Sequence, residues 1–226
     1  MFSFKDRERG GYRTMTEIAT EAIKEAVLQG TYKPGTRLIP AQLEKELNLG
    51  RVAIREALRE LTGSGLVVSV PNKGAIVAKA VDAEEMRELF EIRYDLEGKA
   101  CELAAARISD EQLSKLELLN NDLAGYQEDP REFFLLNRKF HLDFYSASGW
   151  DFLCHIITQL FDRVLVFRSI YPINQEAIPG YVDDHAELLA VARNRDAARA
   201  KQVMIRHLEA GFQSFLSILE KNDLQN

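Results

Sequence analysis

Apolar positions in the first third of the chain recur at helical spacing in three segments. Two short strand-like runs come after these segments. Thr14 with Glu17 forms a capping pattern that predicts a helix ending near Leu28. A short helix is predicted after Pro40, and a third over residues 51–62. The third helix has one apolar face, because its apolar residues fall at i, i+3, i+4 and i+7; they are Ile54, Ala57, Leu58 and Leu61.

Two strands are predicted directly after these helices, over residues 66–70 and 75–77. The sequence between them is Pro-Asn-Lys-Gly, which is typical of a hairpin turn. Short helices followed at once by a hairpin give the order of elements in a winged helix-turn-helix. A DNA-binding domain is therefore predicted over residues 1–80.

From Ala80 onward the periodicity is helical throughout, and capping residues divide it into segments. Asp82 and Ser109 each begin a segment, and Asp129 precedes a proline at the first helical position, where the missing N–H costs nothing. The predicted helices cover about residues 82–106, 109–126, 129–149, 151–171, 180–193 and 196–219. The fold class is therefore mainly α, with the winged helix-turn-helix followed over residues 81–226 by an antiparallel bundle of six or seven helices.

The polar face of the third predicted helix is the candidate DNA-reading surface. Val52, Arg55 and Arg59 project from it, and Arg51 stands at its N-terminal end, which in a recognition helix meets base edges. An arginine there can donate two hydrogen bonds to guanine, worth about 1–3 kcal/mol of discrimination. The alternative is a solvated face of Arg–Glu pairs, because glutamates lie nearby in the sequence.

Charge distribution favours the DNA-binding interpretation. Residues 1–80 hold 13 Lys and Arg against 9 Asp and Glu, whereas residues 81–226 hold 16 against 26. The overall net charge of −6 therefore combines +4 in the N-terminal third with −10 in the remainder. A basic unit supplies the attraction for phosphates that DNA affinity requires.

The sequences PGTRL, LNLGRVAIREALRELTGSGLV and NKGAIV resemble the DNA-binding domain of GntR-type bacterial transcription regulators. The resemblance implies that Arg51 and Arg55 contact bases or phosphates and that Gly74 lets the wing tip enter the minor groove. Gly50 stands where the family usually has Ser or Thr, which predicts a weaker affinity or an unusual operator. The full set of DNA-binding candidates is Arg37, Arg51, Val52, Arg55, Arg59, Lys73 and Gly74.

Three of the four histidines fall on apolar stripes of three different helices in the second domain. His141 interrupts the apolar stripe of its helix one turn after Asn137. His185 and His207 each lie on the apolar stripe of a later helix, whereas His155 lies off the stripe of its helix. One inward histidine is commonly a hydrogen-bonded core residue. Three are expensive to bury without a shared purpose, and neutral imidazoles converging on a divalent transition metal provide one.

The second domain also resembles the FCD ligand-binding domain of the FadR-like branch of the GntR family. The resemblance rests on NRKFH at 137–141, DDHAELL around His185 and AARAKQVMIRHL around His207, with an interval of 22 residues from His185 to His207. It implies a metal held by Asn137, His141, His185 and His207, where the position of Asn137 is commonly Asp in the family. Zinc or nickel is the expected metal. The resemblance further implies a homodimer and a small organic acid effector beside the metal.

Arg93 and Glu97 form a second inward pair on the first helix of this domain. One interpretation is an i,i+4 ion pair that satisfies itself internally. The other is that Arg93 receives the effector's carboxylate through two parallel hydrogen bonds. The R-x-x-x-E pattern resembles the family at this helix and keeps Arg93 as the effector-binding candidate.

Composition is that of an ordinary globular protein, with 46% hydrophobic and 28% charged residues. Cys101 and Cys154 have no metal-ligand spacing, so a reduced, cytoplasmic location is expected. No apolar run approaches the ~20 residues of a membrane span, and the first residues lack an apolar signal core.

The sequence thus predicts a DNA-binding transcription regulator, a repressor that recognises a two-fold symmetric operator as a homodimer. A carboxylate effector beside a metal would control its affinity. The alternatives are a metal-dependent helical-bundle enzyme and a metal-binding protein without DNA function. No carboxylate on a core stripe near the histidines is placed as a general base, which argues against the enzyme.

Overall fold

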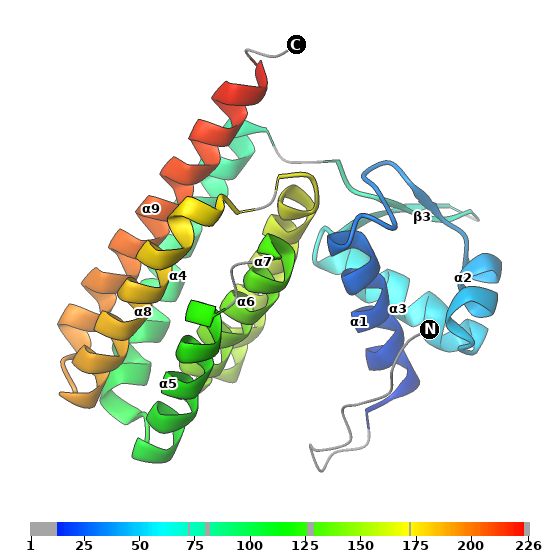
Figure 1. Ribbon diagram of the computed structural model, residues 1–226. Helices are drawn as coiled ribbons and strands as arrows, with labels where there is room; N and C mark the ends of the chain where they lie inside the picture. Colours follow the sequence, from blue (N-terminus) through cyan, green and yellow to red (C-terminus); the bar gives the residue numbers. More distant parts are fainter. Residues whose placement is uncertain (1–12, 72, 80–81, 126–128, 172, 224–226) are drawn as a thin grey trace.

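The computed structural model describes residues 13–71, 73–79, 82–125, 129–171 and 173–223. A small winged-helix domain stands beside a larger helical domain (Figure 1). The first domain contains α1 (Met15–Leu28), β1 (Arg37–Leu38), α2 (Pro40–Leu47), α3 (Arg51–Gly63), β2 (Val67–Val70) and β3 (Gly74–Val77). The second contains α4 (Ala83–Arg107), α5 (Asp110–Gly125), α6 (Pro130–Ser146), α7 (Asp151–Ile170), the 3-10 turn η1 (Gln175–Ala177), α8 (Ile178–Arg193) and α9 (Ala197–Asp223).

Local chemistry fixes the ends of the helices in the first domain. Thr14 and Glu17 form the predicted capping box of α1, with each side chain bonded to the other residue's backbone N–H. α2 begins with Pro40 at its first position and ends at Leu47, and its C-cap Asn48 adopts the left-handed conformation. Gly50 is the N-cap of α3, as the sequence predicted, and provides no side-chain cap.

The sheet of the first domain has three antiparallel strands in the order β1-β3-β2. The hairpin of β2 and β3 was predicted, but β1 was not. β1 has only two residues, so no alternation of apolar and polar positions can reveal it. It pairs Arg37 with Ile76 and Leu38 with Ala75, and so attaches the loop before α2 to the wing.

The helical domain is a bundle in which α4 packs along α9 and α5 packs against α6 and α8. Two differences from the predicted helices occur near Pro179. α8 begins at Ile178 rather than Gly180, because proline is accommodated in the first turn of a helix, and η1 precedes it. The predicted end of one helix at Tyr126, the wing-turn residue Asn72, the domain boundary at 80 and the N-terminal residues 1–12 lie outside the described residues.

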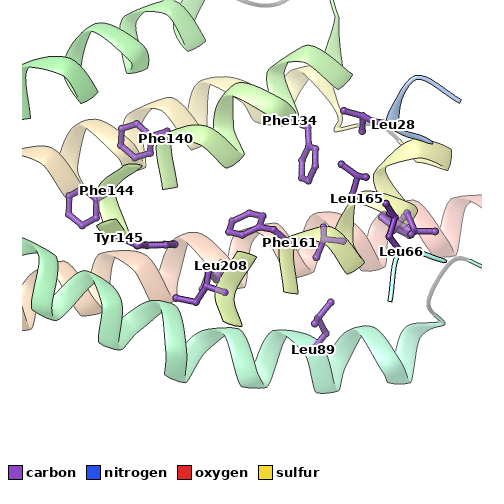
Figure 2. Packing of buried hydrophobic residues seen from close by; sticks show 14 of the residues in the cluster. Leu28, Leu66, Leu89, Phe134, Phe140, Phe144, Tyr145, Phe161, Leu165 and Leu208 are labelled. Atoms are coloured by element: carbon purple, nitrogen blue, oxygen red, sulfur yellow. The ribbon is translucent and has the colours of Figure 1, made fainter. Parts of the chain in front are cut away.

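The two domains meet where α1 packs against α7. Leu28 and Leu66 of the first domain belong to the same continuous cluster of buried residues as Phe134 and Leu165 of the second (Figure 2). An ion pair of 2.8 Å joins Lys24 on α1 to Asp162 on α7. Within the described part of the chain, no helix is both long enough and apolar enough to cross a membrane.

Candidate DNA-binding surface and metal centre

The outer face of α3 is open to a partner. Val52 is 78% exposed, and Arg51, Arg55 and Arg59 are also exposed. Arg51 is ion-paired with Glu44 at 2.8 Å, and Arg59 lies 3.6 Å from Glu56. Such exposed pairs contribute little to stability and can be exchanged for phosphate contacts.

Arg55 differs from its two neighbours on α3. Across the described ranges its side chain has no hydrogen bond or ion pair, although it lies on the same exposed face. Its guanidinium can therefore approach a duplex without first giving up a partner. The solvated Arg–Glu face weighed from the sequence applies to Arg51 and Arg59 but not to Arg55.

The wing brings together the remaining DNA-binding candidates. Arg37 Nε donates to the backbone carbonyl of Lys73 at 3.4 Å, which draws β1 to the wing tip. Gly74 has φ +92°, and a Cβ there would lie 2.2 Å from the Leu38 carbonyl oxygen. The close approach of β1 is thus sufficient by itself to require glycine at this position.

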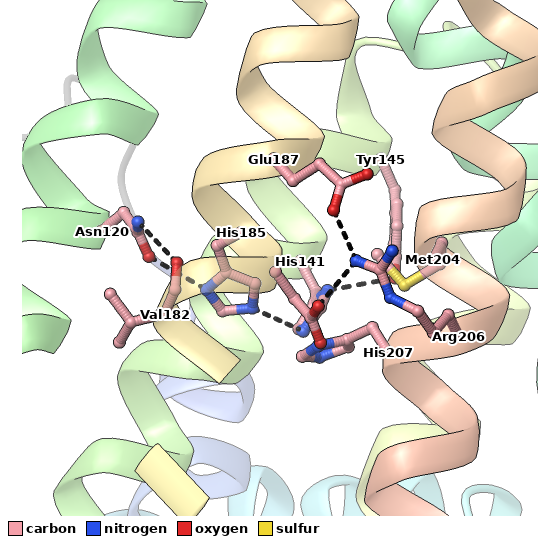
Figure 3. A network of polar contacts seen from close by, with 10 residues as sticks. Asn120, His141, Tyr145, Val182, His185, Glu187, Met204, Arg206 and His207 are labelled. Carbon is pink, nitrogen blue, oxygen red and sulfur yellow. Dashed lines mark hydrogen bonds and ion pairs between the residues drawn. The ribbon is translucent and has the colours of Figure 1, made fainter. Parts of the chain in front are cut away.

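Three buried imidazoles converge in the centre of the helical domain (Figure 3). His141 comes from α6, His185 from α8 and His207 from α9, with exposed fractions of 1%, 1% and 6%. One ring nitrogen of each lies within 4.8 Å of those of the other two. His155 is exposed on α7 and takes no part, as its place off the apolar stripe predicted.

The Nδ1 atom of His185 is held by a side chain that the sequence analysis missed. Asn120 on α5 lies with Oδ1 3.1 Å from that nitrogen. Its Nδ2 donates to the Val182 carbonyl at 3.1 Å, which orients the amide so that Oδ1 accepts from the imidazole. Asn120 shares a stripe with three buried leucines of α5, so a polar residue on a core stripe was the available signal.

The other two imidazoles are held at Nδ1 in the same way. His207 Nδ1 lies 3.1 Å from a carboxylate oxygen of Asp184, and His141 Nδ1 lies 3.2 Å from the Tyr145 hydroxyl. That hydroxyl donates to Glu97 at 2.6 Å and is therefore free to accept from the ring. In all three rings the Nδ1 proton is used locally, which leaves the Nε2 lone pair for the centre.

The Nε2 atoms of His141 and His185 approach to 3.3 Å. Burial lowers the pKa of both imidazoles well below the usual value, and the neighbouring histidines lower it further. Both rings are therefore neutral near pH 7, and the neutral imidazole is the form that binds a metal. Two lone pairs that face each other repel unless a cation or a proton lies between them.

Asn137, the fourth donor expected from the sequence, lies on the cavity beside the histidines. Its Oδ1 is buried and has no hydrogen-bond partner within the described residues, and it lines the same cavity as His141 and His207. An unpartnered buried oxygen is costly and is satisfied when it coordinates a cation. Three imidazole nitrogens and one amide oxygen thus fit a divalent transition metal, with less negative charge than an Asp would provide.

A cavity of about 50 Å³ adjoins these donors. Arg93 lines it, and its Nε donates to Glu97 at 2.5 Å while its guanidinium lies 4.7 Å and 4.8 Å from the Phe90 and Phe161 ring centroids. The predicted inward ion pair is therefore present. Arg168 on α7 lines the same cavity and was not singled out from the sequence.

Comparisons with known proteins agree with this division into a winged helix and a helical ligand domain. Residues 16–77 match the model of bacterial regulatory proteins, gntR family, and residues 88–210 match the FCD domain. The HTH-type transcriptional repressor GlaR of Escherichia coli (strain K12) is 30% identical over 198 residues, which cover 82% of this chain and 89% of GlaR.

A second relative, the HTH-type transcriptional regulator McbR of the same organism, is 30% identical over 178 residues, which cover 77% of this chain and 80% of McbR. The solved structure of E. coli McbR/YncC superposes with a TM-score of 0.80 at 25% identity over 93% of this chain and 100% of that one. The chain therefore belongs to the GntR family of transcription regulators, with an N-terminal DNA-binding domain and a C-terminal FCD effector-binding domain, and is a regulator rather than an enzyme.

Proposed function

We propose that this regulator is a repressor that binds its operator as a homodimer and responds to a small organic acid bound beside a divalent transition metal. The convergence of three buried imidazoles, each held at Nδ1, carries the proposal. Burying three imidazoles costs desolvation free energy, and a ligand that all three share would offset that cost. The relative GlaR is named a transcriptional repressor, which supports repression rather than activation.

The proposed metal ligands are Nε2 of His141, His185 and His207 and Oδ1 of Asn137. Imidazole nitrogen suits zinc and nickel, which are the metals proposed here. When bound, the metal would supply positive charge to a carboxylate oxygen of the effector. The protein's own part is to orient the imidazoles and to exclude water through the surrounding apolar side chains.

The proposed DNA contacts come from α3 and the wing. Arg51, Arg55 and Arg59 would face the major groove, Val52 would make apolar contact with it, and the wing candidates Arg37, Lys73 and Gly74 would face the adjacent backbone. Two copies of α3 in a dimer would address half-sites one helical turn apart, which is about 34–36 Å. A two-fold symmetric dimer would recognise a two-fold symmetric operator. The proposed location of the regulator is the cytoplasm.

Metal dependence is tested by comparing His185→Ala with His155→Ala. Both variants remove one imidazole, but only the first removes a proposed ligand. After reconstitution with zinc or nickel, we expect one metal per chain by elemental analysis in the wild type and in His155→Ala, and a loss of at least about tenfold in affinity in His185→Ala. A wild type that takes up neither metal would exclude the metal from the proposal.

DNA recognition is tested by fluorescence polarisation with genomic fragments at fixed salt. We expect Arg55→Ala to weaken operator binding about ten- to a hundredfold and to relax one base preference, without changing metal content. Lys115→Ala, which removes an exposed charge on α5 far from the wing, is the matched control. Equal binding by the wild type and Arg55→Ala would overturn the assignment of α3.

A further inference from the structure

Arg168 is a buried cation without a counter-charge. Its exposed fraction is 6%, and neither Nε nor Nη1 has an acceptor among the residues that the structure describes. Burial lowers the pKa of Arg168 to about 10, so the guanidinium is still charged at neutral pH. A buried unpaired charge costs several kcal/mol, and an anion in the cavity would offset that cost.

Acids near the cavity are already engaged with other groups. Glu97 accepts from Arg93 and from the Tyr145 hydroxyl, and Asp184 accepts from His207 and Arg206. None of the described residues that line the cavity is an Asp or a Glu. An anionic ligand in the cavity can therefore supply the counter-charge that these residues do not.

The same argument changes the role of Arg93. Its guanidinium is neutralised by Glu97 and enclosed by two aromatic rings, so a carboxylate would have to compete with an existing buried ion pair. Arg168 has no such competitor within the described ranges, and its guanidinium can offer two parallel N–H donors.

The proposed metal site and Arg168 together carry more positive charge than one carboxylate can balance. Imidazole nitrogens and the Asn137 amide bring no negative charge to a divalent ion, so it would stay at +2, and Arg168 adds +1. Arg168 is seven residues beyond Phe161 on α7, which corresponds to about 10 Å along the helix axis. The Phe161 ring lies 5.9 Å from that of His141, so Arg168 enters the cavity at a different level from the imidazoles.

We infer that the effector of this regulator is a short dicarboxylate, with one carboxylate at the metal end of the cavity and the other on Arg168. The inference rests on the proposed metal-assisted binding of an acid and specifies its chemical class. The cavity of about 50 Å³ holds only a few atoms of water size and therefore favours a compact carbon chain. A monocarboxylate would leave either the metal or Arg168 without its anion.

The test compares matched acids that differ by one carboxylate: acetate with malonate, propionate with succinate, and butyrate with glutarate. Calorimetric titration of the zinc-loaded full-length protein should show at least one dicarboxylate binding about 30-fold or more tightly than its partner. Arg168→Met should abolish this preference and weaken monocarboxylate binding by less than about threefold. Arg199→Met, at an exposed arginine on α9, is the control and should keep the preference.

Arg168→Lys keeps the charge but loses the planar fork, so an intermediate preference is expected. Arg168→Met should retain metal content, operator binding in the absence of acid, and a melting temperature no lower than that of the wild type, because an unpaired buried charge has been removed. These controls separate a loss of recognition from a loss of folding.

Two results would overturn the inference: no dicarboxylate binds more tightly than its partner, or Arg168→Met keeps the wild-type preference. If a monocarboxylate alters operator binding equally in the wild type and in Arg168→Met, the proposed function stands and only the dicarboxylate class fails. If no acid of either kind alters operator binding, the effector part of the proposed function fails as well.

Discussion

A histidine has two ring nitrogens, and the hydrogen bond at one decides what the other can do. In this protein each inward ring has a different acceptor at Nδ1: an amide for His185, a carboxylate for His207 and a hydroxyl for His141. The tautomer is thereby the same in all three although the chemistry of the acceptor differs. Residues that contact no metal therefore determine whether a metal can bind.

Asn120→Ala tests this dependence. The substitution removes the acceptor for His185 Nδ1 and leaves the three imidazoles in place, so we expect metal affinity to fall about 10- to 100-fold. Affinity is measured by competition with a chelator of known strength. Asn121→Ala changes the neighbouring exposed amide and should bind metal like the wild type. Unchanged affinity in Asn120→Ala would mean that apolar packing alone orients the ring.

Asn137→Asp tests the fourth donor. The amide oxygen is buried and unpartnered, and a carboxylate at the same position would add a negative charge beside the proposed cation. We expect metal affinity to rise about tenfold or more, because a charged ligand binds a divalent ion more strongly than a neutral one. The metal-free variant should be less stable than the wild type, since its buried carboxylate then lacks a counter-ion. An affinity equal to that of the wild type would remove residue 137 from the ligand set.

At the scale of elements, the wing depends on a contact between backbones. Gly74→Ala places a methyl group 2.2 Å from the Leu38 carbonyl and forces φ +92° on an L residue, so we expect a loss of about 1–3 kcal/mol in the free energy of unfolding. Gly63→Ala, at the end of α3 with open space around it, should instead be neutral or stabilising by up to about 1 kcal/mol. Urea unfolding measures both. A neutral Gly74→Ala would show that β1 can move away from the wing.

Most elements could be predicted from the sequence because their signals are local. Capping residues and apolar stripes predicted the α-helices of the described ranges to within a few residues, and the four positions proposed to hold metal were found from polar residues on core stripes. β1 could not be found, because two residues carry no periodicity and the strand exists only through pairing with β3.

The hydrogen-bond acceptors of the three histidines were harder to predict than the histidines themselves. Asn120 reaches His185 from a different helix, and the sequence gives no sign of which residues on separate helices will be at the same level. Asp184 and Tyr145 lie beside predicted ligands but were not recognised as their hydrogen-bond acceptors. Arg168 continues the apolar stripe of α7 one turn after Val164, so it was detectable as an inward charge.

At the scale of the whole molecule, adjacent residues of α6 and α7 connect the cavity with the DNA-binding domain. Asn137 and Phe161 line the cavity. Their chain neighbours Arg138 and Asp162 form an ion pair at 3.1 Å, and Asp162 also holds Lys24 of α1. A shift of α6 against α7 upon effector binding would therefore change the contact that fixes α1. Such a shift alters operator affinity only as far as the effector distinguishes the two arrangements.

Asp162→Asn tests this connection between the domains. The amide keeps the volume of the side chain but removes the charge that two cations share, so we expect a loss of about 3 kcal/mol in stability. Metal affinity should stay within about threefold of the wild type, because none of the ligands or their hydrogen-bond acceptors is changed. The ratio of operator affinities with and without effector should move towards one, since the ion pair that joins α1 to α7 is lost. Asp143→Asn, which removes an exposed ion pair on α6, should leave this ratio unchanged. A full effector response in Asp162→Asn, measured by polarisation at saturating acid, would assign the coupling to the apolar contacts of Leu28 and Leu66 instead.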